Sequence, residues 1–184
     1  PGRRMSYSQK ESNFNWIVKT VNEILYNNQD FKGIIHTGSY ELSKKLLDNV
    51  STDNKERILD YANSAAKKEN LKVFLQSNNK VLIGPSLLEG LDLFEDNSRF
   101  QIFIKVPFPS LGDRYVKRKM EMMKEWYDWK TITSILQGVG RSIRSPEDWA
   151  RTYFLDGCLS DLFKRSRTNF GKEFLERIII KHDD

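Results

Sequence analysis

Along this chain, short apolar runs alternate with longer stretches in which apolar residues recur at the spacing of a helix. The short runs have the length of a strand, and several are rich in β-branched residues. Such alternation is typical of strand–helix–strand units around a parallel sheet. Because the runs are continuously apolar, we expect helices to cover both faces of that sheet. The predicted strands are Gly33–Thr37, Lys80–Gly84, Phe100–Val106 and Thr152–Asp156.

Helical spacing of the apolar residues predicts the elements between these strands. Ser39 follows the first strand and is a residue type that suits a helix N-cap. The predicted helices are one that ends near Asn27–Asn28, one that begins after Ser39, one from about Asp113 to Leu136, and one from about Gly171 to Ile180.

The segment 54–76 is ambiguous. Leu71–Leu75 has the propensity of a strand, yet it also stands where a helix that begins near Ser64 would end. We predict the helix.

The composition fits one globular domain, because 184 residues with 39% hydrophobic content can form a substantial core. We predict a single domain over residues 1–184, with residues 1–12 as a linker or an artificial start. No apolar run approaches the roughly 20 residues of a membrane span, so no membrane partner is expected. The single cysteine, Cys158, predicts no metal site and fits a reducing compartment, so we expect an intracellular protein of the cytoplasm or nucleus.

The charge permits, but does not require, binding to a polyanion. Lys and Arg number 30 against 25 Asp and Glu, which gives a net charge of +5. Many ordinary basic proteins carry a comparable excess. Nothing in the sequence implies an oligomer.

Four motifs fall on this framework. Residues 137–144 read Q-x-x-G-R-x-x-R after the long helix, and residues 84–93 read G-P-S-L-L-E-G-L-D-L between two predicted strands. V-P-F-P at 106–109 follows the next strand, and I-H-T-G-S-Y at 35–40 ends the first. In order and spacing, these motifs resemble those of the second motor domain of superfamily 2 helicases of the XPD/DinG type. The resemblance covers residues 14–180.

The resemblance implies an α/β fold, a RecA-like open parallel sheet flanked by helices on both faces. It implies that this chain is the second helicase motor domain of an ATP-dependent DNA helicase that moves along single-stranded DNA from 5′ to 3′. Its partners would be single-stranded DNA and the protein's own N-terminal motor domain. Two alternatives remain: a degenerate helicase-like interaction module, and an RNA helicase of a related branch.

By the same resemblance, the last motif faces ATP. A planar guanidinium stabilises the charge that develops on the γ-phosphoryl oxygens better than a hydrated lysine does. We therefore expect Arg144 to be the arginine finger, Arg141 to hold the same phosphate, and Gln137 to sense the nucleotide. The other residues expected at ATP are Glu89, Gly90, Asp92 and Gly140.

The candidate contacts to nucleic acid lie in loops after strands and on the long helix. In open α/β sheets, ligands bind at the carboxyl ends of the strands, and helix starts suit phosphates. The candidates are Ser39, Tyr40, Ser86, His36, Lys117 and Arg118. For His36 a structural role is the stronger alternative, and for Lys117 and Arg118 it is a solvated helix face.

The sequence contains neither a G-x-x-x-x-G-K-[ST] phosphate loop nor a D-E-x-H-type acid pair. The resemblance places the ligands of Mg²⁺, and any iron–sulfur cluster, in a preceding domain. We therefore expect this fragment alone to be inactive. One departure from the family is that the strand ending in Asp156 is followed by Gly157, where the family often has D-x-R.

Overall fold

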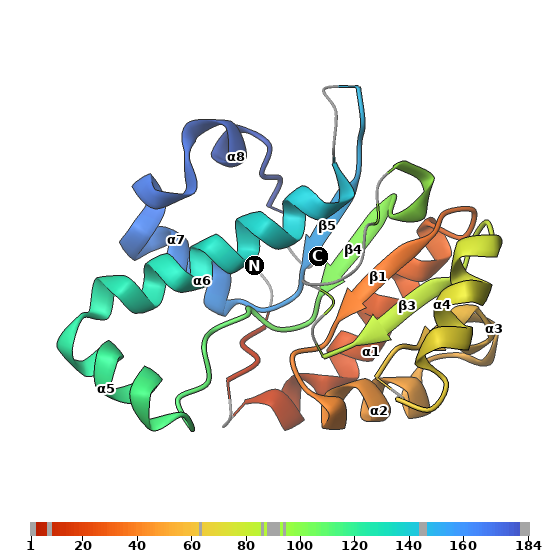
Figure 1. The fold of residues 1–184 in the computed structure, drawn as a ribbon, viewed down its shortest axis with the longest axis horizontal. Helices are drawn as coiled ribbons and strands as arrows, with labels where there is room; N and C mark the ends of the chain where they lie inside the picture. Colours follow the sequence, from red (N-terminus) through yellow and green to blue (C-terminus); the bar gives the residue numbers. More distant parts are fainter. Residues whose placement is uncertain are drawn as a thin grey trace.

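The computed structural model describes residues 3–6, 9–62, 64–85, 87, 93, 95–143 and 147–180. At its centre is a five-stranded sheet with the order β2-β3-β1-β4-β5, in which every neighbouring pair is parallel (Figure 1). The predicted RecA-like α/β class is confirmed. The strands are β1 (Gly33–His36), β2 (Ile58–Asp60), β3 (Val81–Gly84), β4 (Phe100–Phe103) and β5 (Arg151–Phe154).

β1 lies in the middle of the sheet, and all four of its residues are buried. Gly33 pairs with Val81 on one side and with Phe100 on the other. A Cβ atom at Gly33 would lie 2.4 Å from the ring of Phe100, so only glycine fits there. The start of the central strand is thus packed closely against β4.

Helices cover both faces, as the continuous apolar strands predict. α1 (Lys10–Asn27) and α2 (Tyr40–Asn49) pack on the face that carries Ile35 and Ile102, and α3 (Thr52–Arg57) leads from α2 into β2. α4 (Lys67–Gln76) packs on the opposite face through Phe74, beside Ile34. Figure 1 shows the two layers on either side of the sheet.

A second group of helices packs beside β5. Ile132 of α6 (Lys124–Val139) forms a separate apolar cluster with Leu159 of α7 (Cys158–Ser166), and Val106 and Phe170 complete it. α5 (Arg114–Met122) extends from this group to one end of the molecule, and α8 (Lys172–Glu176) lies at its other side (Figure 1).

Several boundaries differ from the prediction. The single helix expected from Asp113 to Leu136 is two helices, because Met123 between α5 and α6 has non-helical backbone angles, φ −143° and ψ 77°. Leu71–Leu75 lies within α4, so the choice of a helix is confirmed. β4 ends at Phe103, short of Val106. The elements α3, β2 and α7 were not predicted, and the terminal helix is shorter than expected.

The N-terminal segment is more ordered than a linker would be. Met5 is buried, and its backbone N–H donates to Oδ1 of Asp156 at 3.0 Å. α1 begins at Lys10. Met5 thus contacts the end of β5, and residues 10–12 form the start of α1. Within the described ranges, no helix combines the length and apolar character needed to cross a bilayer.

Candidate nucleotide and DNA interfaces

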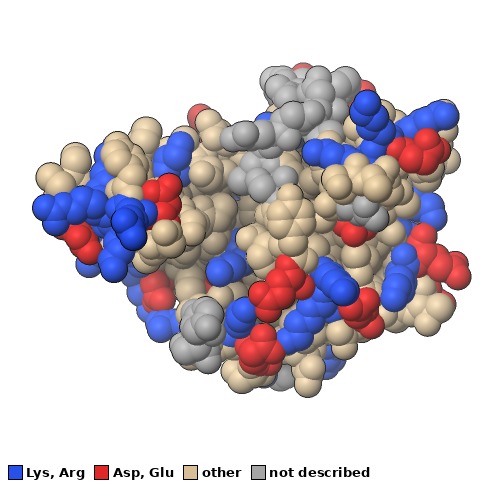
Figure 2. All heavy atoms as spheres, turned by 60° about the horizontal axis from the view of Figure 1, so that its bottom comes forward, with Lys and Arg blue, Asp and Glu red and all other residues tan. Residues whose placement is uncertain are grey.

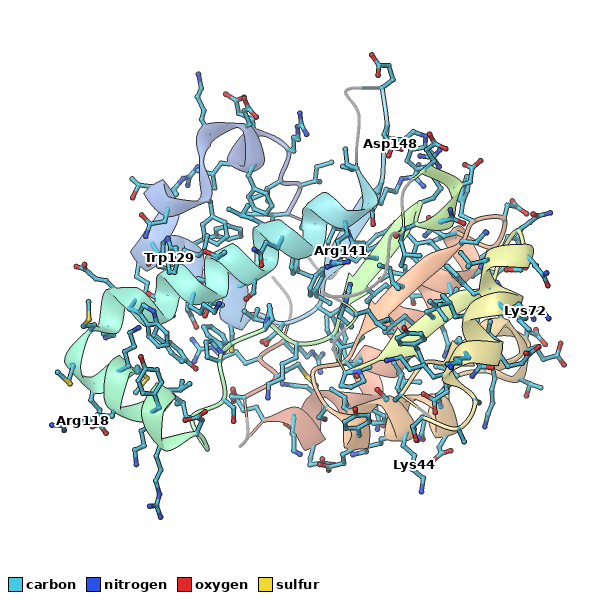
Figure 3. All side chains as sticks on the ribbon, viewed as in Figure 1. Lys44, Lys72, Arg118, Trp129, Arg141 and Asp148 are labelled. Atoms are coloured by element: carbon cyan, nitrogen blue, oxygen red, sulfur yellow. The ribbon has the colours of Figure 1, made fainter. Side chains whose placement is uncertain are left out.

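The end of α6 presents the residues of the last motif. Gln137 is exposed in the final turn of α6, and Arg141 follows, half-buried, in the 3-10 turn Gly140–Ser142 (η2). Ser142 is buried, and its Oγ lies 2.6 Å from the Oγ of Ser98, just before β4. This hydrogen bond anchors the turn to the sheet. Figure 3 shows Arg141 between α6 and the strands.

A buried histidine links β1 to this turn. His36 is 3% exposed, and its Nε2 lies 3.2 Å from Oε1 of Gln101. Gln101 donates from Nε2 to the carbonyl oxygen of Val139, the last residue of α6, at 3.3 Å. Burial lowers the pKa of His36 to about 4, with the charge of Arg141 acting in the same direction and the Gln101 hydrogen bond against it. The imidazole is therefore neutral near pH 7.

The burial of His36 bears on its candidate role in binding nucleic acid. Its ring stacks on Phe103 with 4.3 Å between centroids, and Phe103 stacks on Phe154 at 4.8 Å. A side chain enclosed in this way offers almost no surface to a nucleic-acid strand. Its surroundings are those of a structural histidine, and its contacts connect the first motif to the last.

Gly140 is a glycine that the fold does not require. Its φ of −67° and ψ of −10° are helical values that any residue adopts. Among the described residues, no atom lies within 4 Å of a Cβ atom placed on it. Alanine would be the better residue for a helix end of this geometry. The open backbone leaves room for close approach by something outside this chain.

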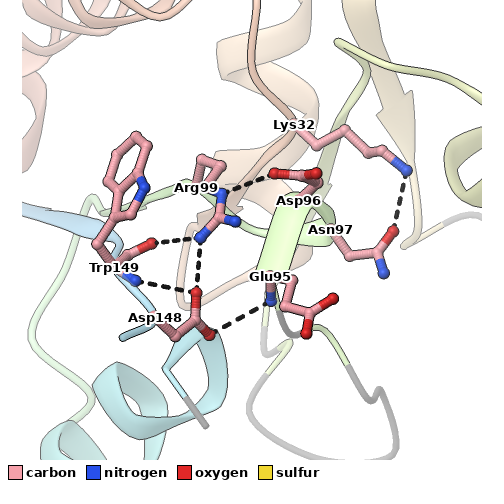
Figure 4. Close-up of polar contacts among 7 residues, drawn as sticks. All are labelled: Lys32, Glu95, Asp96, Asn97, Arg99, Asp148 and Trp149. Atoms are coloured by element: carbon pink, nitrogen blue, oxygen red, sulfur yellow. Dashed lines mark hydrogen bonds and ion pairs between the residues drawn. The ribbon is translucent and has the colours of Figure 1, made fainter. Parts of the chain in front are cut away.

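Five of the candidate residues lie outside the described residues: Arg144, Ser86, Glu89, Gly90 and Asp92. The residues that follow each motif are described, and the segment before β4 contacts the segment before β5. Oδ1 of Asp148 accepts from Nη1 of Arg99 at 2.6 Å, and Oδ2 accepts from the backbone N–H of Glu95 at 3.4 Å (Figure 4). Asp148 lies just before β5, and Arg99 just before β4. The chain that follows each motif therefore enters the sheet beside the other, at the starts of the neighbouring strands β4 and β5.

Ser39 and Tyr40 lie in the loop between β1 and α2. Ser39 is the predicted N-cap, because its Oγ accepts from the N–H of Leu42 at 3.2 Å. Gly38 before it has φ +79°, a conformation that favours glycine and turns the chain away from the strand. Tyr40 is 68% exposed. With Lys44 it borders a shallow hollow of about 580 Å³ beside α2.

Lys117 and Arg118 lie on a different part of the surface. Both are exposed on α5, which carries four basic residues in nine and no buried residue. Figure 2 shows Lys and Arg side chains gathered at this end of the molecule, and Figure 3 shows Arg118 there, apart from Lys44 and Arg141. Arg118 forms a loose ion pair with Glu121 at 3.8 Å. The structure therefore separates the α5 candidates from Ser39 and Tyr40.

Two aspartates with buried side chains, Asp148 and Asp156, have roles that the sequence did not predict. Asp156 accepts hydrogen bonds from the backbone N–H groups of Met5, Val106 and Cys158, each at 3.0 Å. Asp156 thereby ties the N-terminal segment and the V-P-F-P stretch to the end of β5. A signal existed for each position, because Asp156 ends an apolar strand and Asp148 comes four residues after Arg144.

Within the parts of the chain that the structure describes, no group of three or more His, Cys, Asp or Glu side chains is arranged to hold a metal ion. Burial and the neighbouring Asp156 raise the pKa of the Cys158 thiol to about 11. A thiol with this pKa is protonated near pH 7 and is a poor nucleophile.

These observations agree with comparisons to known proteins. A family model described as the helicase C-terminal domain matches residues 23–176. The chain belongs to this family. The match spans the first sheet strand, the α6 end and the buried links between them, so the predicted resemblance to XPD/DinG-type helicases is confirmed for the family and the fold.

Two curated relatives match parts of this helicase C-terminal domain. The Fanconi anemia group J protein homolog of Gallus gallus is 30% identical over 80 residues, which is 37% of this chain and 6% of the relative. The ATP-dependent DNA helicase CHL1 of Saccharomyces cerevisiae (strain YJM789) is 28% identical over 110 residues, which is 50% of this chain and 12% of the relative. The chain thus spans a small share of the length of either.

A solved structure shares the fold over nearly the whole domain. The structure of S. tokodaii Xpd4 superposes with a TM-score of 0.67 and 17% identity, and the match covers 95% of this chain and 36% of that one. The parallel sheet with helices on both faces is therefore that of the XPD helicase structure. At this identity the likeness concerns the fold alone.

Proposed function

We propose that this chain is the second motor domain of an ATP-dependent DNA helicase or translocase that acts on single-stranded DNA. The observation that carries the proposal is the placement of Gln137, Gly140 and Arg141 together on the anchored end of α6, with open space beside Gly140. The family and the names of the two relatives support a DNA helicase as the whole protein.

In this proposal the last motif acts on ATP held between two motor domains. Arg144 is the arginine finger, and Arg141 places a second guanidinium near the same phosphate. Such a finger contributes roughly 10³–10⁵ in rate in P-loop NTPases, which corresponds to about 4–7 kcal/mol of transition-state stabilisation. Gln137, neutral and exposed, is placed to link the γ-phosphate to the attacking water or to the facing domain.

The segment before β4 contributes to the same nucleotide site. Glu89, Gly90 and Asp92 form the E-G-L-D motif, and Asp92 would receive the ribose hydroxyls or an arginine of the last motif. The Asp148–Arg99 contact supports this arrangement, because it returns both motif segments to one point on the sheet.

In this proposal, single-stranded DNA binds at the loops that follow β1 and β3. Ser39, Tyr40 and Ser86 would contact the backbone of single-stranded DNA, since helix starts offer N–H groups to phosphates. The exposed ring of Tyr40 suits stacking on a base. Lys117 and Arg118 would contact DNA only if the strand continues to α5.

ATP and Mg²⁺ are held mainly by another domain in this proposal. The chain has no phosphate-loop motif, so the cradle and the Mg²⁺ ligands belong to the N-terminal motor domain, as would any iron–sulfur cluster. What this chain supplies is cationic side chains and a glycine that permits close approach.

The proposal is tested with the full-length protein and with the 184-residue chain. The full-length protein should hydrolyse ATP faster when single-stranded DNA is added, and RNA of the same sequence should stimulate it less. The chain alone should hydrolyse no more ATP than buffer, because it supplies a finger without a cradle. Hydrolysis by the purified chain that DNA stimulates would contradict the two-domain arrangement.

A further inference from the structure

A buried ion pair joins the two strands at one edge of the sheet. Nη1 of Arg99 lies 2.6 Å from Oδ1 of Asp148, and the two side chains are only 13% and 3% exposed. The same Nη1 also donates to the carbonyl oxygen of Trp149 at 2.9 Å, while Nε donates to Asp96 at 2.9 Å. Arg99 is therefore held from three sides by groups on two segments (Figure 4).

The aspartate is held equally firmly. Its Oδ1 also accepts from the backbone N–H of Trp149 at 2.9 Å, and its Oδ2 accepts from the N–H of Glu95 at 3.4 Å. The indole of Trp149 is flanked by the guanidinium groups of Arg99 and Arg151, 5.0 and 5.3 Å from the ring centroid. Trp149 thus contacts Arg99 both through its ring and through its carbonyl oxygen.

The residues held by this ion pair come shortly after two of the motifs in the sequence. Glu95 comes three residues after Asp92, and Asp148 comes four residues after Arg144. Two residues separate Asp92 from Glu95, and three separate Arg144 from Asp148. The ion pair therefore joins the chain that follows the E-G-L-D motif to the chain that follows the arginine motif.

We propose that the Arg99–Asp148 pair is a positioning device that sets the spacing between the E-G-L-D motif and the arginine motif. This inference rests on the proposed function, in which both motifs meet ATP. Neither Arg99 nor Asp148 touches the nucleotide. Each acts through the segment that it anchors, so its loss misplaces Asp92 and Arg144 relative to the same phosphate.

The chemistry of the pair suits positioning better than stability. Burying two charges is costly, and apolar residues of similar size often stabilise a fold as well or better. A guanidinium with several fixed hydrogen bonds, in contrast, defines one geometry. Burial lowers the pKa of Arg99, but the hydrogen bonds to Asp96 and Asp148 and their charges together raise it above its ordinary value, so the arginine stays charged.

The chain offers a matched control. Arg165 donates from Nε and Nη2 to the two oxygens of Asp128, at 2.6 and 2.8 Å, and Asp128 is 8% exposed. This pair joins α6 to α7. Its shortest N–O distance and its buried carboxylate match those of the Arg99–Asp148 pair, whereas its contact is bidentate and its arginine is more exposed. It anchors neither motif directly.

The test compares Arg99→Lys and Asp148→Asn with Arg165→Lys and Asp128→Asn in the full-length protein. For each variant, Tm, nucleotide affinity, and kcat and KM for DNA-stimulated ATP hydrolysis are measured. We expect the first two to lower kcat by about 10²-fold with little change in KM, since small misplacements have effects of this size. The control variants should lower Tm comparably and leave kcat within about twofold. Equal losses of kcat at equal losses of Tm would overturn the proposal.

Hydrogen exchange in the same proteins supplies a readout that does not depend on catalysis. Either Arg99→Lys or Asp148→Asn should accelerate exchange in both the peptide containing Glu95 and the peptide containing Asp148. Acceleration confined to the substituted segment would show that the pair does not couple the motifs. If the wild-type protein hydrolyses no ATP with DNA, or if Arg141→Ala keeps full activity, the proposed function fails instead.

Discussion

Arg141 lies close enough to His36 for its guanidinium charge to help lower the pKa of the buried imidazole to about 4, although burial is the larger cause. The two residues belong to the last and the first of the four motifs, more than a hundred positions apart in the sequence. Gln101 completes the link, because it contacts both His36 and the end of α6. The loop after β1 and the arginine turn are thus joined through the interior of the domain.

This relationship predicts a pH dependence of stability. The unfolded chain protonates His36 below its ordinary pKa of 6.5, whereas the folded domain resists protonation until about pH 4. The unfolded state therefore binds more protons in this window, and the free energy of unfolding should fall as the pH decreases through it, by up to about 3 kcal/mol. Urea unfolding of the isolated chain at several pH values measures this.

One substitution tests whether His36 is responsible. His36→Gln should flatten the dependence between pH 6.5 and 4. An equally steep dependence in the His36→Gln variant would contradict the assignment.

The arginines should matter for rate more than for nucleotide binding. In the full-length protein, Arg144→Ala should reduce ATP-driven unwinding by about 10³-fold or more and leave nucleotide affinity nearly intact, because a finger acts as charge develops. Arg144→Lys should rescue little, since an ammonium lacks the planar fork. Arg177→Ala, at an exposed arginine after α8, is the control and should change neither quantity. Normal unwinding by the lysine variant would show that Arg144 is an ordinary surface charge.

A substitution at Gly140 should affect ATP hydrolysis without lowering the stability of the fold. Gly140→Ala should leave the isolated chain as stable as before or more stable by up to about 1 kcal/mol, because the backbone is helical and the space is open. ATP hydrolysis by the full-length protein should nevertheless fall, since the new methyl group would enter space needed for the nucleotide or the facing domain. Gly112→Ala, before α5, is the control and should change neither property. Full activity of Gly140→Ala would show that nothing approaches there.

Much of the fold could be predicted because its signals are local. β1 and β3 are apolar runs with clear boundaries, and Ser39 caps α2 as its residue type suggests. β2 has only three residues and follows a charged helix directly, so its pattern is too short to recognise. The break at Met123 has no Pro or Gly to mark it.

The candidate site divides in the same way. Gln137, Gly140 and Arg141 could be named because a motif carries them within eight residues. Asp148 could not be assigned a role, because its partner Arg99 is 49 positions away and only the folded sheet brings them together. The sequence around Asp148 marks the position but does not identify its partner.

The last prediction concerns DNA binding by the isolated chain. It should bind single-stranded DNA weakly, with little sequence preference and with affinity that falls as salt rises. Because Ser39 Oγ caps α2, its removal would also weaken the helix; Ser39→Asn and Ser39→Asp both keep a cap. We expect the aspartate to repel phosphate and weaken binding more than the asparagine. Tyr40→Ala should weaken binding at every sequence, and Tyr40→Phe should not.

The contribution of α5 is measured in the same titrations. If Lys117 and Arg118 contact phosphates, replacing both with Ala should reduce the slope of log affinity against log salt by about 1.4, or about 0.7 for each contact. Lys68→Ala with Lys72→Ala removes the same charge from exposed positions on α4 and is the control. If the DNA strand runs over the loop after β1, the Ser39 and Tyr40 variants should weaken DNA binding more than the α5 variant does. If only the α5 variant abolishes binding, the strand lies along α5, and its placement at the carboxyl edge of the sheet is wrong.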